Sequence, residues 1–182
     1  MEQGRRHPVR SHLKLSPQCF TNALELCETD PCLENRKYLT VGNIGRLNRL
    51  LERYTKAPEL LQQALALADS LHGPPLQERG ILVGELGALY RQTNRHKGAR
   101  EMFASQYNLA KKMGWKGQVC RVIGNIGMAN CQLARQIWRD SRGNGEAIEE
   151  AKDLTHLAIT QLKDRVQLAL DIQEEEDAHA HS

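Results

Sequence analysis

Side chains that could perform catalysis are few in this chain and are not spaced for it. The sequence contains no His-x3-His pair, no Cys-x2-Cys pair and no Gly-rich phosphate loop, although metal and phosphate sites depend on such spacings. Gly42-x2-Gly45 has no accompanying lysine or strand, so we expect helix packing there. His156 stands within a helical segment and is expected to be packed or exposed. We therefore predict a protein that is not an enzyme, with no catalytic residues, no metal site and no cofactor.

Composition suits a soluble globular protein. The net charge of +3 is too small, and the basic residues too scattered, for a nucleic-acid-binding stripe. No apolar run approaches the roughly 20 residues of a membrane span, so we expect no membrane partner. The five cysteines are an odd number without tight pairing, which favours reduced core residues and a cytoplasmic location.

A short phrase occurs three times and predicts the architecture. Each copy has an aliphatic residue, a glycine, a polar residue, an aliphatic residue and a second glycine, and the second glycines are Gly45, Gly87 and Gly127. They follow one another at 42 and 40 residues. A fixed period of this size is typical of stacked repeats. Because glycine inside a helix costs about 1 kcal/mol relative to alanine, we expect a partner helix to approach closely at each.

Apolar spacing predicts an all-α protein of about seven helices. We expect them at residues 13–28, 36–52, 55–71, 76–93, 96–113, 116–138 and 146–173. Thr55 is the expected N-cap of the third, with Pro58 in its first turn.

The helices group into one repeat domain over residues 13–172. It comprises a half repeat at 13–30, a repeat at 36–73, a repeat at 76–114 and a longer repeat at 116–172. The glycine-to-alanine offset is 12 residues from Gly45 to Ala57 but 31 from Gly127 to Ala158, an insertion of 19. We expect a polar loop at 139–145 followed by an unusually long helix. Residues 1–12 should form a disordered basic tail and residues 173–182 an acidic tail.

The second unit resembles the tetratricopeptide repeat (TPR). It reads Val83-x2-Leu86-Gly87-x2-Tyr90, then Ala99-x3-Phe103, and the family pattern is a large residue-x2-Leu-Gly-x2-Tyr, then Ala-x3-Phe. The other two units match in register, but Asn48 and Asn130 replace the tyrosine. The period is similar to that of the long-helix subclass found in kinesin light chains and LGN-type scaffolds. HEAT and armadillo repeats have a comparable period but do not explain the Leu-Gly-x2-Tyr phrase.

This resemblance implies a right-handed superhelical solenoid of antiparallel helix pairs. Independently of the family, the close approach that the motif glycines require predicts small residues opposite them. Here the expected small residues are Ala57, Ala99 and Ala158.

The resemblance also implies a concave groove lined by the first helix of each pair. The residue two positions before the motif glycine faces this groove in the family, which gives Asn43, Glu85 and Asn125. Asparagine can hold the backbone of an extended peptide because it both donates and accepts hydrogen bonds, whereas Glu85 only accepts.

Four arginines are expected broadly on the same wall. By helical spacing they are Arg46, Arg49, Arg91 and Arg121. Guanidinium groups bind carboxylates and phosphates through two parallel hydrogen bonds. We therefore predict a scaffold that binds an extended protein segment, acidic or phosphorylated.

Two alternative functions stay open on the sequence alone. Phe20, Leu24 and Cys27 would form an unpaired apolar face on the N-terminal half repeat, through which the chain could form a homo-oligomer or pair with a further repeat region. The other alternative is an enzyme, or an enzyme accessory, whose site is formed by the insertion at 139–157.

Overall fold

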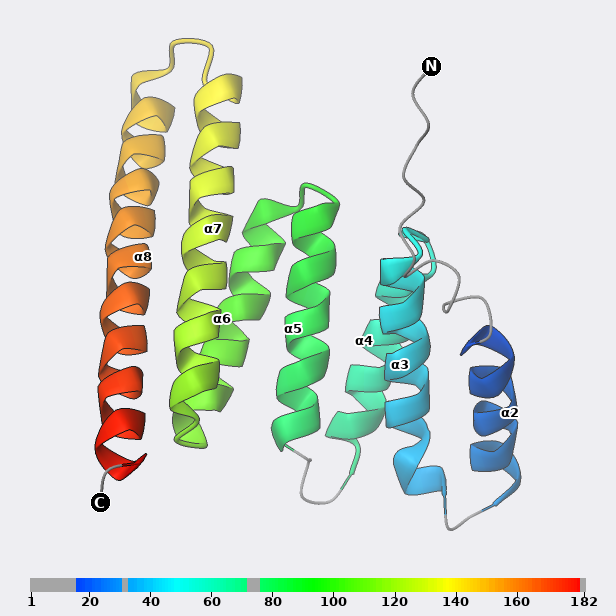
Figure 1. Ribbon diagram of the computed structural model, residues 1–182. Helices are drawn as coiled ribbons and strands as arrows, with labels where there is room; N and C mark the ends of the chain where they lie inside the picture. Colours follow the sequence, from blue (N-terminus) through cyan, green and yellow to red (C-terminus); the bar gives the residue numbers. More distant parts are fainter. Residues whose placement is uncertain (1–15, 31–32, 72–75, 181–182) are drawn as a thin grey trace, which may run out of the picture. The chain divides into compact units, whose positions relative to one another are not determined.

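The computed structural model describes residues 16–30, 33–71 and 76–180, and all regular secondary structure in these residues is helical (Figure 1). The helices are α2 (Ser16–Thr29), α3 (Lys37–Leu50), α4 (Ala57–Asp69), α5 (Leu76–Gln92), α6 (His96–Lys112), α7 (Lys116–Asp140) and α8 (Gly145–Ala180), with a short 3-10 helix η1 (Glu34–Arg36) before α3. The all-α prediction is confirmed. The predicted tail at 1–12 lies outside the described residues.

The chain divides into two compact units, Met1–Leu82 and Val83–Ser182. In the first unit α3 packs against both α2 and α4, and in the second unit α7 packs against both α6 and α8. Helices that follow one another in the sequence are therefore packing neighbours within each unit, as expected of helical repeats.

The corner between the two helices of a repeat is the same in the first and second repeats. Glu52 and Asn94 both adopt left-handed backbone, with φ of 59° and 58°. The residue after each donates its N–H to the carbonyl oxygen five residues earlier, at 2.8 Å in both cases. This bond satisfies a carbonyl that the end of the helix would otherwise leave unpaired. The expected N-cap at Thr55 is wrong, because the corner places Lys56 before α4 and its side chain makes no capping hydrogen bond.

Each motif glycine lies against a large side chain of the following helix. A Cβ atom built on the glycine would lie at these distances: 2.8 Å from Leu61 Cγ for Gly45, 2.7 Å from Phe103 Cε1 for Gly87, and 3.0 Å from Leu162 Cγ for Gly127. Such distances leave no room for a methyl group. The close approach predicted from the three glycines is confirmed.

The expected partners of these glycines need one correction. The atoms nearest to Gly45 and Gly87 belong to Leu61 and Phe103 rather than to Ala57 and Ala99. Both alanines are nevertheless completely buried. The glycine makes space for the large residue one turn beyond the alanine, because residues four apart lie on the same side of a helix.

The 19-residue insertion lengthens the last helix pair at both helices. α7 has 25 residues and α8 has 36, and the connection between them is confined to residues 141–144. Asn144 closes the turn, because its Oδ1 accepts the N–H of Glu146 at 3.0 Å. The polar loop is thus shorter than expected. α8 also continues to Ala180, since residues 173–180 are mainly Glu, Gln and Ala, which favour helix, with no Gly or Pro.

Candidate protein-interaction surface

A polar stripe runs along one solvent-facing side of α7. Its members recur at alternating spacings of four and three residues, which keeps them on one side of the helix. They are Arg121, Asn125, Met128, Gln132, Arg135 and Arg139. The three arginines and Met128 are exposed, and the two amide residues are partly buried. We call this set the α7 stripe.

The chemistry of the α7 stripe suits an extended acidic ligand. It contains three guanidinium groups and no carboxylate. The side-chain oxygen of Gln132 is buried and has no hydrogen-bond partner among the described residues. From Arg121 to Arg139 the stripe covers about 27 Å at 1.5 Å per residue. That length matches roughly eight residues of extended peptide at about 3.3 Å each.

Three of the predicted groove residues lie on α3 in the first unit. Asn43 and Arg46 are exposed and, three residues apart, are surface neighbours. Arg49 is partly buried. It follows Asn43 by six residues, which turns it about 120° around the helix, towards the packed side of α3.

The other four predicted groove residues lie in the second unit. Arg121 and Asn125 are brought together on the α7 stripe, where Arg121 donates a hydrogen bond to Gln118 Oε1. Glu85 and Arg91 on α5 are both partly buried and, six residues apart, point about 120° away from each other. A single groove that joins all seven residues stays a prediction.

The C-terminal half of the α7 stripe was not predicted from the sequence. Gln132, Arg135 and Arg139 continue the spacing that begins at Arg121 and Asn125. The signal was available, because the expected helix already reached residue 138. It was overlooked because the family pattern draws attention to the residues around the motif glycine.

A buried histidine lies at the start of α6. The exposed fraction of His96 is 6%, and its Nδ1 has no hydrogen-bond partner within the described part of the chain. Burial lowers the pKa of His96 below the usual 6.5, and the positive charge of Arg139 lowers it further. The neutral imidazole is therefore favoured at neutral pH, and the basic end of the α7 stripe acts electrostatically on it.

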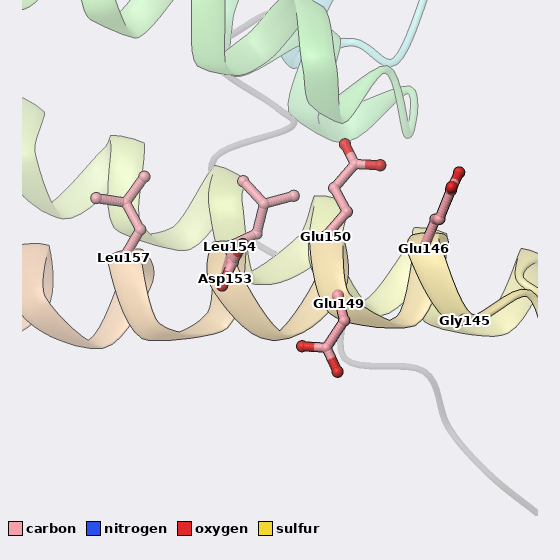
Figure 2. Close-up of a pocket in the computed structure, with 7 residues that line it drawn as sticks. All are labelled: Gly145, Glu146, Glu149, Glu150, Asp153, Leu154 and Leu157. Carbon is pink, nitrogen blue, oxygen red and sulfur yellow. The ribbon is translucent and has the colours of Figure 1, made fainter.

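The insertion forms an open, acidic depression on the first half of α8 (Figure 2). Its lining is Gly145, Glu146, Glu149, Glu150, Asp153, Leu154 and Leu157. All seven residues come from one helix, and in Figure 2 the side chains of Glu149 and Glu150 point in opposite directions. The described residues contain no group of three or more His, Cys, Asp or Glu side chains placed to hold a metal ion. The depression offers carboxylate acceptors and two leucines, without a nucleophile paired to a base.

The expected unpaired face of the N-terminal half repeat is wrong for Cys27. This residue is buried, and its Sγ lies 3.7 Å from Thr40 Oγ1 of α3. Leu24 is partly buried, and the side chain of Phe20 lies outside the described residues. Packing against α3 therefore covers part of the face that was expected to be open.

No described helix combines the length and the hydropathy that a membrane span requires.

The tetratricopeptide repeat family model matches residues 37–112 of this chain. The match covers α3 to α6, and the family predicted from the repeated phrase is confirmed over these residues. Tetratricopeptide repeats generally mediate protein–protein interactions and act as non-catalytic scaffolds.

Comparison with solved structures supports the fold of a longer part of the chain. The crystal structure of BtubC (BKLC) from P. vanneervenii is similar with a TM-score of 0.54 and 17% sequence identity over 87% of this chain. This chain spans 59% of the length of that one. At this identity the likeness concerns the fold alone. A search of curated proteins found no match.

Proposed function

We propose that this protein is a protein-interaction module that binds an extended acidic segment along the α7 stripe. The observation that carries the proposal is the exposure of Arg121, Arg135 and Arg139 on one side of α7 with no carboxylate among them. Each guanidinium can form two parallel hydrogen bonds to a carboxylate or phosphate of the ligand. Asn125 lies between Arg121 and Arg135, and its amide can bond to the peptide backbone, independently of its sequence.

Within each unit, the proposal also includes the predicted groove residues on the other first helices. These are Asn43, Arg46 and Arg49 on α3 and Glu85 and Arg91 on α5. Among them, the exposed neighbours Asn43 and Arg46 repeat the pairing of amide and guanidinium seen at Asn125 and Arg121. Glu85 would disfavour an acidic residue at its own position, so the ligand should carry a neutral or basic residue there.

Charge reversal on the α7 stripe tests the proposal. The probe is a fluorescein-labelled octapeptide of alternating Glu and Ser, titrated with the full chain and followed by fluorescence anisotropy. Arg121→Glu and Arg135→Glu should each raise the Kd about tenfold or more, because an attraction becomes a repulsion. Lys111→Glu makes the same charge change at an exposed site on α6 and should change the Kd by less than about twofold.

Two results would contradict the proposal. One is equal weakening by Lys111→Glu and by the stripe variants, which would indicate attraction to net charge alone. The other is a parent chain that binds the acidic probe no better than a Lys–Ser octapeptide. Circular dichroism of each variant verifies that it remains folded.

A further inference from the structure

α8 carries an apolar stripe that no described helix covers. Ile159, Val166 and Leu170 have exposed fractions of 48%, 60% and 53%. Their spacing of seven and four residues places them on one side of the helix. Leu162 and Lys163 join Ile159 and Val166 in lining an open groove there. Exposed aliphatic side chains that lie side by side, rather than singly, are typical of an interaction surface. We call Ile159, Val166 and Leu170 the α8 stripe.

The two ends of the α8 stripe carry opposite charges. Lys152 lies seven residues before Ile159, and Asp177 lies seven residues after Leu170, which continues the same side of the helix in both directions. Both already have local partners. Lys152 Nζ lies 2.6 Å from Glu149 Oε1, and Gln173 Nε2 donates to Asp177 Oδ1 at 3.0 Å. These contacts are solvent-exposed, and exposed pairs of this kind contribute little, so neither prevents a contact with another molecule.

We propose that α8 packs antiparallel against α8 of a second copy of this chain. In one register Ile159 meets Leu170 of the second copy and Lys152 meets Asp177 of the second copy. Both pairs are symmetric about the same midpoint, between residues 164 and 165, so a two-fold axis there forms each contact twice. A parallel arrangement would place Lys152 beside Lys152 and Asp177 beside Asp177. The charges therefore favour the antiparallel register.

Self-complementarity is the reason for choosing a second copy as the occupant. Along about 38 Å from Lys152 to Asp177, this side of the helix carries an apolar centre with one ammonium group, that of Lys152, before it and one carboxylate, that of Asp177, after it. The stem of Lys163 can cover Val166 of the other copy while its ammonium stays in water. Leu157, by contrast, is 45% exposed but lies in the acidic depression, where two copies would repel each other. The contact uses α8 and is separate from the peptide site proposed on the α7 stripe.

Sedimentation velocity of the purified full chain tests this pairing in the absence of any peptide. The sedimentation coefficient should rise with concentration between about 1 and 200 µM at low salt, within the range typical of weak interfaces. Val166→Glu should raise the dimer Kd about tenfold or more. Leu157→Glu puts the same charge on an exposed apolar position of the same helix and should leave the dimer Kd within about twofold. A chain that stays monomeric throughout, or equal effects of the two variants, would overturn the proposal.

A charge exchange between copies tests the register. Lys152→Glu and Asp177→Lys should each raise the dimer Kd about tenfold, because each homodimer then contains two like-charge contacts. An equimolar mixture of the two variants should recover to within about threefold of the parent, since the mixed dimer regains two opposite-charge contacts. Absence of recovery would overturn the antiparallel register. Neither outcome alters peptide binding to the α7 stripe, so the two proposals fail independently.

Discussion

Replacing Gly87 with alanine should destabilise the protein, whereas the same replacement at Gly80 in the same helix should stabilise it. A Cβ on Gly87 would lie 2.7, 2.8 and 3.0 Å from three ring carbons of Phe103. The exposed fraction of Phe103 is 1%, so the ring is enclosed and cannot move aside without disturbing its neighbours. A Cβ on Gly80 would meet no heavy atom of the described residues within 4 Å.

The magnitude follows from two opposing terms. Alanine stabilises a helix interior by about 1 kcal/mol relative to glycine, and Gly80→Ala should show most of this gain. At Gly87 the added methyl overpacks the core, which costs about 1–3 kcal/mol. The two variants should therefore differ by about 1–3 kcal/mol in free energy of unfolding. In a chain of this size, that is a difference of about 2–12 °C in Tm.

Urea and thermal unfolding followed by far-UV circular dichroism measure this difference. Phe103→Leu in the Gly87→Ala background should cost less than in the parent, because it removes the ring carbons that the added methyl group would meet. The reasoning is refuted if both alanine variants are equally stabilised, since α5 and α6 would then not approach closely at Gly87.

Two further predictions concern buried polar groups in the second unit. The pKa of His96 is lower in the folded protein than in the unfolded chain, so below about pH 6.5 the unfolded chain binds more protons than the folded one. The free energy of unfolding should therefore decrease as the pH is lowered through this range, by at most about 1.4 kcal/mol per pH unit. Tm measured from about pH 7.5 to about pH 5.5 should show a flatter decline for His96→Gln than for the parent. Asn130 is fully buried and donates to Gln161 Oε1 at 2.8 Å, while its own Oδ1 has no partner in the described structure. Asn130→Asp should lower the free energy of unfolding by about 2–4 kcal/mol in urea titrations, because it buries a charge. A loss of less than about 0.5 kcal/mol would instead show that water reaches this position.

The helix pairs and their close approaches could be predicted because their signals are local and repeated. Gly45, Gly87 and Gly127 recur at nearly one period with aliphatic residues at helical spacing around them. A glycine that costs helix stability three times in register requires a packing reason, and that reason does not depend on the rest of the molecule. The identity of the opposing side chains was harder to predict, because it depends on the rotation of one helix against its neighbour.

The candidate binding surface was only partly predictable. Arg121 and Asn125 were found from the repeat pattern, and Arg135 and Arg139 were accessible from the same spacing. The partly buried state of Arg49, Glu85 and Arg91 could not be inferred in the same way. Helical spacing states which residues share a side of a helix, but not how much of that side the neighbouring helices cover.

By itself the sequence determined a repeating all-α architecture and the places where its helices meet. Only the tertiary structure decided which apolar side of α8 is covered. Ala151, Leu154 and Ala158 are buried, whereas Ile159 and Val166 on another side of the same helix are exposed. Both sets have spacing suited to packing, but among the described helices of its unit α8 has one extensive packing neighbour, α7. A helix with two apolar sides and one packing neighbour leaves one apolar side exposed. The position of that neighbour decides which of the two sides is exposed.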